Sequence, residues 1–129
     1  MAMQNLNHKH ILVTAHISNP PTDPNIVSNW LTDLVKKVNM KILFGPHCTY
    51  CETGGNVGVT GVVCIETSHA SIHIWNEGDP AFLKFDLYSC KDFSNEVIIE
   101  HLDEQFKLID YEYMIIDRNS GLEVKEHIR

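Results

Sequence analysis

Alternating side chains over residues 68–75 and 81–90 predict two neighbouring strands of a β-sheet. Successive side chains of a strand point to opposite faces of the sheet. One face of this pair is apolar and holds Ala70, Ile72, Ile74, Ala81, Leu83, Phe85 and Leu87. The other face holds His69, Ser71, His73, Trp75, Phe82, Lys84, Asp86, Tyr88 and Cys90. The intervening residues 76–80 include Asn, Gly, Asp and Pro, which favour turns. We therefore expect a hairpin that buries one face and displays Ser, His and Cys on the other.

Two stretches with apolar residues at helical spacing predict two helices. The first begins at Pro24 behind an Asp23 N-cap and buries Ile26, Val27, Trp30, Leu31, Leu34, Val35 and Val38. The second covers residues 93–108 and points Val97, Ile98, Leu102 and Phe106 inward. Further strands are predicted at 9–17, 41–44, 57–66 and 111–118, with an irregular loop at 45–56 and a polar tail up to residue 129. This order predicts an α+β fold, a two-layer α/β sandwich with a mainly antiparallel sheet and both helices on one face.

Length, composition and charge describe one domain of ordinary globular character. A chain of 129 residues with 43% hydrophobic residues fits a single domain over residues 1–129. The net charge of −7 disfavours nucleic acid and anionic membranes as partners. No apolar run is long enough to span a membrane, and residues 1–10 lack the apolar stretch of a signal peptide, so we expect a cytoplasmic protein. In that reducing compartment the four cysteines are expected to be free thiols.

Cys48 and Cys51 form a CxxC motif, a spacing found in many zinc sites. A structural zinc site needs four ligands. The histidines that could complete one here are His47, His10, His16 and His69. We expect loop cysteines without a metal, and a metal bound by Cys48 and Cys51 stays the alternative. The glycine-rich residues 54–58 lack the Lys and the following helix of a phosphate-binding loop, which favours a simple turn.

Ser68, His73 and Cys90 are the candidate reactive side chains. Taken singly, each has a more common structural interpretation, because serines often begin strands, histidines hydrogen-bond locally, and strand cysteines are usually buried. Their convergence on one predicted hairpin is what makes them a candidate site.

Three motifs in this region resemble the bacterial and archaeal S-adenosylmethionine decarboxylases. They are Gly58-Val59-Thr60-Gly61-Val62-Val63, then Ser68-His69 followed by Ile72-His73, Trp75 and Glu77, and then Asp86-Leu87-Tyr88-Ser89-Cys90. The resemblance extends from about Lys9 to Leu102. It implies an α/β sandwich, assembled as a dimer of cleaved protomers with active sites near the interface. It also implies a decarboxylase without an external cofactor, which makes a pyruvoyl group from an internal serine by cutting its own chain.

Carried over by motif, the resemblance assigns the chemistry to a few residues. Ser68 would attack the carbonyl of Thr67, and breakdown of the resulting ester would leave a pyruvoyl group derived from Ser68. His73 would help to remove the α-proton in that step, because imidazole is a base near neutral pH. The pyruvoyl carbonyl would form a Schiff base with the substrate amine and act as an electron sink for loss of carbon dioxide. Cys90 would then return a proton to the carbanion.

Four residues occupy supporting positions according to the same resemblance. Thr60 stands where the family usually has a processing serine, and it keeps a hydroxyl. Glu77 resembles a residue that helps to hold the substrate ribose, and Trp75 is a further candidate substrate contact. Thr67 stands where the family normally has Glu.

The leading prediction is a pyruvoyl-dependent decarboxylase of a small-molecule substrate, S-adenosylmethionine, for spermidine and polyamine synthesis. One alternative is the same chemistry on arginine or ornithine, and another is an uncleaved, non-enzymatic relative that acts as a binding or regulatory module. Because two helices cover one face of the sheet, we expect a symmetric partner over the other face and therefore a homodimer. Residues 45–57 are expected near the active cleft.

Overall fold

A computed structural model of the chain describes residues 7–129. Residues 1–6, part of the start for which no signal peptide is expected, lie outside the described residues. Neither helix within residues 7–129 has the length and apolar character that a membrane span needs.

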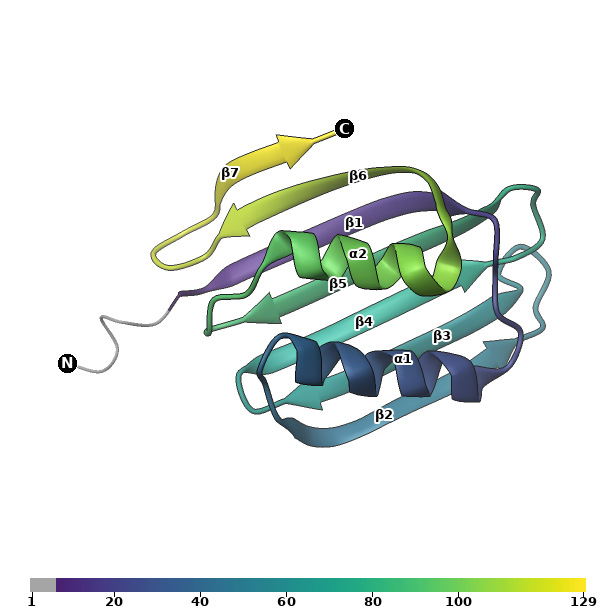
Figure 1. Ribbon diagram of the computed structural model, residues 1–129, viewed down its shortest axis with the longest axis horizontal. Coiled ribbons are helices and arrows are strands. Elements are labelled where there is room, and N and C mark those ends of the chain that lie inside the picture. The colour runs from purple at the N-terminus through teal and green to yellow at the C-terminus, as the bar shows by residue number, and fades with distance from the viewer. Residues whose placement is uncertain (1–6) are drawn as a thin grey trace.

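Within the described residues, the chain forms one antiparallel sheet of seven strands with two helices on one face (Figure 1). The elements in chain order are β1 (Lys9–Ile17), α1 (Pro24–Lys37), β2 (Ile42–Cys51), β3 (Gly58–Ile65), β4 (Ser68–Trp75), β5 (Ala81–Ser89), α2 (Asn95–Phe106), β6 (Leu108–Asp117) and β7 (Glu123–Ile128). The strands lie in the order β2-β3-β4-β5-β1-β6-β7. The predicted α+β sandwich with both helices on one face is confirmed.

The core lies between the sheet and the helices, as the alternation of side chains predicted. The alternate residues of β1, β4 and β5 that face the helices are almost fully buried, among them Ile11, Ile72 and Leu83. Helix α1 begins as expected, since the Asp23 side chain accepts a hydrogen bond from the backbone N–H of Asn25 and Pro24 occupies the first turn. Among residues 7–129, no helix covers the opposite face of the sheet, and we call this face the open face.

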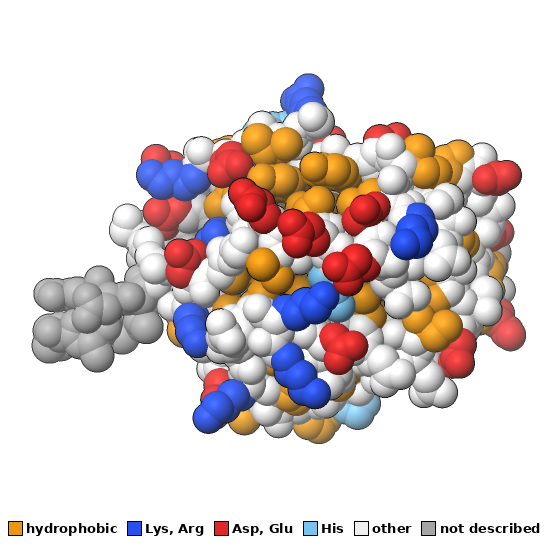
Figure 2. All heavy atoms as spheres, in the orientation of Figure 1, with side chains coloured by type: hydrophobic (Ala, Val, Ile, Leu, Met, Phe, Trp, Pro, Cys, Tyr) orange, Lys and Arg blue, Asp and Glu red, His pale blue; other side chains and the backbone are white. Residues whose placement is uncertain are grey.

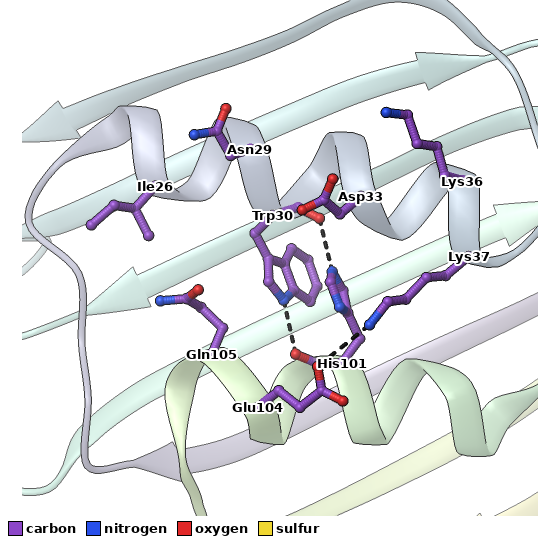
Figure 3. A pocket seen from close by; sticks show the side chains of 9 residues that line it. All are labelled: Ile26, Asn29, Trp30, Asp33, Lys36, Lys37, His101, Glu104 and Gln105. Atoms are coloured by element: carbon purple, nitrogen blue, oxygen red, sulfur yellow. Dashed lines mark hydrogen bonds and ion pairs between the residues drawn. The ribbon is translucent and has the colours of Figure 1, made fainter.

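Trp30 of α1 and His101 of α2 join the two helices. Figure 3 shows their side chains between the helices, and the rings stack with centroids 4.6 Å apart. The indole Nε1–H donates to the His101 carbonyl at 3.0 Å, and Nε2–H of His101 donates to the Trp30 carbonyl at 2.9 Å. Burial lowers the pKa of His101, so this imidazole is held in its neutral form.

Two predicted segments differ from the structure, and both lie at sheet edges. The expected irregular loop over residues 45–56 is wrong, because β2 continues through Cys51 and pairs with β3, leaving a turn around Gly54 and Gly55. Pro46 makes this segment look unlike a strand, because proline lacks a backbone N–H. An edge strand tolerates proline, and here the pairing shifts register between Phe44 and His47. The polar tail contains β7, whose residues are all exposed and therefore carry no buried alternation.

Charged side chains cover the helix face of the molecule. Figure 2 shows acidic side chains gathered over α2 and Lys side chains towards the C-terminal end of α1. A cavity of 660 Å³ lies between the helices and is the one drawn in Figure 3. The predicted reactive residues belong to strands and turns of the sheet and not to this cavity.

Candidate active site

The peptide bond between Thr67 and Ser68 lies at the turn that joins β3 to β4. Ser68 is the first residue of β4 and pairs with Ser89 at the end of β5. The backbone N–H of Cys90 donates a hydrogen bond of 3.0 Å to the carbonyl oxygen of Thr67. This contact places Cys90, by its backbone, against the carbonyl that self-cleavage would require Ser68 to attack.

Ser68 has an unusual backbone conformation, with φ of 154° in a non-glycine residue. Such conformations are sparsely populated and store strain where the surrounding structure imposes them. By strand parity Ser68 falls with Ala70 on the helix side of the sheet, yet its Oγ lies 3.2 Å from Nδ1 of His69, which belongs to the open face. The hydroxyl therefore lies at the boundary between the two faces, beside an imidazole.

A polar network extends from this point across the open face. We call it the open-face network, and its members are His8, His10, His69, Ser71, Asp86, Tyr88 and Arg118. Asp86 is its centre, accepting hydrogen bonds from His10 Nε2 at 2.8 Å and from the Ser71 hydroxyl. Burial opposes ionisation of Asp86, but the hydrogen bonds from His10 and Ser71 and the nearby positive charge outweigh it, so the pKa of Asp86 is below its usual value.

Arg118 closes the network from the far end of β6. Its guanidinium lies 4.0 Å from the centre of the Tyr88 ring, and Nη1 lies 3.3 Å from Nδ1 of His10. The hydroxyl of Tyr88 bonds Nδ1 of His8 at 2.8 Å. The hairpin pattern placed Asp86 and Tyr88 on this face, whereas Arg118 and His8 were not predicted as site residues and His10 was considered only as a possible zinc ligand. Alternation along β1, which sets His10 opposite Tyr88, could have found His10.

His73 and Thr60 form a second, separate cluster. They pair directly across β3 and β4, and Nδ1 of His73 lies 3.2 Å from the Thr60 hydroxyl. The His73 ring stacks on Trp75 at 5.6 Å. His73 follows Ser68 by five residues of extended strand, which separates their Cα atoms by about 17 Å.

Cys90 is equally remote from His73. His73 pairs with Lys84, and Cys90 comes six residues after Lys84, about 20 Å further along the strand direction. The alternation of side chains puts both His73 and Cys90 on the open face. Within one chain, however, they lie too far apart along the strands to share a cleft. A single chain therefore holds Ser68 and Cys90 at one end of the β4–β5 pair and His73 near the other.

Trp75 and Glu77 lie at the His73 end of the sheet. Trp75 Nε1–H donates to the Asn56 side chain at 3.2 Å. The Glu77 carboxylate accepts backbone N–H groups of Gly55 and Val57 at 2.9 Å and 3.3 Å. Both residues therefore brace the turn between β2 and β3 against the end of β4. Residues 52–57, part of the segment expected near an active cleft, contact Trp75 and Glu77 and so lie at the His73 end of the sheet, away from Ser68.

Cys48 and Cys51 point to opposite sides of β2. Cys48 pairs with Gly61 and packs under α1, where a Cβ on Gly61 would lie 2.6 Å from the Cys48 sulfur. Burial raises the pKa of the Cys48 thiol, and all four cysteines are unpaired. Among residues 7–129, no three His, Cys, Asp or Glu side chains gather closely enough to hold a metal ion. The CxxC spacing therefore does not form a chelate within the described residues.

A hollow of 440 Å³ lies on the open face between the two clusters. Ser71 and Asp86 line it from the side of the open-face network, and His73 and Lys84 line it from the other side. Glu112 and His127, which are hydrogen-bonded to each other at 2.5 Å, bring β6 and β7 to its rim. Of the three candidate reactive residues, His73 lines this hollow, whereas Ser68 and Cys90 do not.

Comparison with known proteins gives one consistent result. The family model described as S-adenosylmethionine decarboxylase matches residues 9–119. A protein named S-adenosylmethionine decarboxylase proenzyme from Pyrococcus horikoshii is 30% identical over 107 residues, covering 81% of this chain and 73% of that protein. Its namesake from Archaeoglobus fulgidus is 33% identical over 87 residues, 67% of each chain. The one from Thermococcus kodakarensis is 43% identical over 94 residues, covering 66% of this chain and 60% of its own.

Proposed function

The chain belongs to the S-adenosylmethionine decarboxylase family, as its motifs predicted, and we propose that it is a decarboxylase that makes its own pyruvoyl group at Ser68. The observation that carries this proposal is the arrangement at one peptide bond. Ser68 is strained at φ 154°, and the carbonyl of the preceding Thr67 is held by the N–H of Cys90 at 3.0 Å. A nucleophilic hydroxyl, a polarised carbonyl and a strained linkage are what an intramolecular acyl shift needs.

The residues around Ser68 fit a pyruvoyl group. A pyruvoyl carbonyl supplies an electron sink for the loss of carbon dioxide from an amine-bearing substrate. Cys90 is the next residue after Ser89, the partner of Ser68 on β5, and a thiol is a group that can donate a proton. Each of the three relatives is named a proenzyme, which supports chain cleavage as the source of the pyruvoyl group.

The cleavage follows from the groups on this chain. The Oγ of Ser68 attacks the Thr67 carbonyl, and the peptide becomes an ester with a free amine on Ser68. Removal of the Ser68 α-proton expels Thr67 as a carboxylate, and hydrolysis with loss of ammonia leaves the new group at the start of residues 68–129. An ester leaves far more readily than an amide, so the first step makes the second accessible.

We assign the removal of the α-proton to His73 of a partner subunit, because His73 of the same chain is about 17 Å from Ser68. The open face supports a homodimer, since it leaves Leu12 and Val62 exposed without a covering layer. A two-fold axis over this face would set the Thr60–His73 pair of each chain against the Ser68 end of the other. Each of the two equivalent sites would then contain residues from both chains.

S-adenosylmethionine is the substrate that we propose, because each of the similar proteins carries it in its name. In this arrangement Trp75 and Glu77, which lie at the His73 end, come from the same chain as His73. The indole gives an aromatic surface for a nucleobase, and the carboxylate is an acceptor for ribose hydroxyls. The product would serve as an aminopropyl donor for spermidine synthesis.

The test is release of labelled carbon dioxide from carboxyl-labelled S-adenosylmethionine, arginine and ornithine. We expect release from S-adenosylmethionine and none from any substrate with Ser68→Ala. Release from arginine or ornithine would change the substrate while keeping the chemistry. Undiminished release by Ser68→Ala would refute the pyruvoyl mechanism, and no release from any of the three by the unaltered chain would leave the non-enzymatic relative as the better description.

A further inference from the structure

The Ser68 hydroxyl has an imidazole beside it within its own chain. Its Oγ lies 3.2 Å from Nδ1 of His69, which is within hydrogen-bonding reach. The side chain of His69 is 43% exposed, so it is not fixed by the packing of the core. A serine hydroxyl is a weak nucleophile at neutral pH and needs a base to accept its proton.

A carboxylate faces the other nitrogen of the same ring. Nε2 of His69 lies 3.8 Å from Oδ2 of Asp86. Asp86 is itself held by His10 and by Ser71, which is its direct partner across β4 and β5. A negative charge at this place favours the imidazolium that forms when His69 accepts a proton, and it orients the ring. Serine, imidazole and carboxylate therefore stand in sequence, with Nδ1 towards the serine.

The carbonyl under attack is already hydrogen-bonded. The backbone N–H of Cys90 donates to the Thr67 oxygen at 3.0 Å. A fixed donor at this oxygen stabilises the negative charge that develops there as a nucleophile adds to the carbonyl carbon. The chain thus places the His69 imidazole beside the Ser68 hydroxyl and the Cys90 N–H at the Thr67 oxygen, so both groups lie next to the same peptide bond.

We propose that His69, oriented by Asp86, is the general base of the first cleavage step, in which Ser68 attacks the carbonyl of Thr67. This assignment rests on the self-cleavage proposed above. Nδ1 takes the hydroxyl proton as the bond between Oγ and the carbonyl carbon forms. The imidazolium returns that proton to the nitrogen of Ser68 as the peptide C–N bond breaks. The products are an ester and a free amine, and no other reactant is consumed.

The two histidines of β4 then act on different bonds. His69 acts before the ester exists, whereas His73 acts on the ester. Variants at the two positions should therefore stop at different stages. Hydroxylamine cleaves esters and leaves ordinary peptide bonds intact, so it reports which stage a chain has reached.

The test follows freshly synthesised chains by denaturing gel and intact mass, with and without hydroxylamine. We expect His69→Gln to cleave about 100-fold or more slowly than the unaltered chain, the usual scale of general-base catalysis. It should yield no additional pieces with hydroxylamine, whereas His73→Ala should accumulate a hydroxylamine-sensitive chain. Added imidazole should restore part of the cleavage of His69→Gly, an effect that no purely structural role of His69 produces. Circular dichroism shows whether each variant is folded.

His16→Gln is the matched control. His16 lies on the open face, its side chain is 45% exposed, and it hydrogen-bonds Asp110 at 2.9 Å. Like His69 it is a half-exposed histidine beside a carboxylate, but it is not next to Ser68. It should cleave at the unaltered rate. Cleavage of His69→Gln at that rate, or ester accumulation in His69→Gln, would overturn the assignment. If the unaltered chain itself stays intact, the self-cleavage fails and the assignment fails with it, which is a different result from normal cleavage of the variant.

Discussion

Cys90 has two groups with separate proposed roles at the cleavage site. Its backbone N–H holds the Thr67 carbonyl, and this contact persists whatever side chain the residue carries. Its thiol is the group that the family resemblance links to proton return after carbon dioxide has left. The two roles are therefore separable by a change of side chain alone.

Cys90→Ala should cleave its chain at close to the normal rate, because the backbone donor is retained. Turnover should fall by about 100-fold or more, the scale expected for a lost general acid. Protonation at the wrong carbon should also convert the pyruvoyl group to an amine during turnover. Intact mass of residues 68–129 before and after substrate measures both effects, and unchanged turnover would assign the thiol to packing.

The periodicity of the sequence predicted which face of the sheet the candidate residues occupy, but not which of them lie close together. The positions of Ser68 and Cys90 near one another follow from the hairpin register that alternation and the 76–80 turn predict. His69 was predicted on the polar face, within the family motif and as a possible zinc ligand, but no role at Ser68 was predicted for it. Its contact with Ser68 depends on the unusual φ of Ser68. Residue patterns do not reveal a single strained dihedral angle. Five residues of extended strand already imply that His73 is far from Ser68. The prediction nevertheless grouped them, because it relied on the face of the hairpin and not on the distance along the strand.

At the scale of elements, the contact between α1 and α2 depends on a neutral histidine. Nε2–H of His101 bonds the Trp30 carbonyl, and within the described residues its Nδ1 has no hydrogen-bonding partner. Burial lowers the pKa of His101 below its unfolded value of about 6.5. The unfolded chain therefore takes up a proton more readily than the folded chain does. The stabilisation is complete above pH about 6.5 and is lost as the pH falls through the lower, folded pKa.

His101→Gln should remove this part of the acid sensitivity, because an amide keeps a donor for the Trp30 carbonyl and does not titrate. One proton contributes at most about 1.4 kcal/mol of unfolding free energy per pH unit. Urea unfolding at pH 7.5 and 5.0 measures the difference, with the exposed His47→Gln as the control. An identical loss of stability on acidification in His101→Gln and the unaltered chain would contradict the role given to His101.

The elements that the sequence predicted well are those with one buried face. Helix α1 and strands β1, β4 and β5 carry apolar residues at regular spacing because they pack on the core. The second half of β2 and all of β7 lack that signal, since they lie at the two edges of the sheet. Their pairing comes from the neighbouring strand and not from their own pattern. For this reason the segment around Cys48 and Cys51 was expected to be a loop.

At the scale of the whole molecule, the proposed mechanism requires a dimer, because its reactive groups lie in two separate clusters. A chain of this shape holds Ser68 and Cys90 about 17–20 Å from His73, which is too far for proton transfer. The uncovered face that carries both clusters is also the surface that a second copy would cover. The distance between the two clusters and the exposed apolar side chains of the open face therefore favour the same proposed dimer.

Complementation should reveal the shared site. A Ser68→Ala chain cannot cleave but keeps His73, and a His73→Ala chain keeps Ser68 but lacks the base for its ester. When the two are produced together, the His73→Ala chain should be cleaved and the Ser68→Ala chain should stay whole. The matched partner is the double variant Ser68→Ala/His73→Ala, which should give no cleavage. Equal cleavage with both partners would show that His73 acts within its own chain or not at all.

The most direct test of the central claim is the intact mass of the unaltered protein under denaturing conditions. We expect two pieces, residues 1–67 with an ordinary carboxyl end and residues 68–129 beginning with a pyruvoyl group, and a single full-length chain for Ser68→Ala. The piece that begins at position 68 should lack a free amine and resist sequential degradation from its start. A single uncut chain of 14.7 kDa from the unaltered protein would contradict the account.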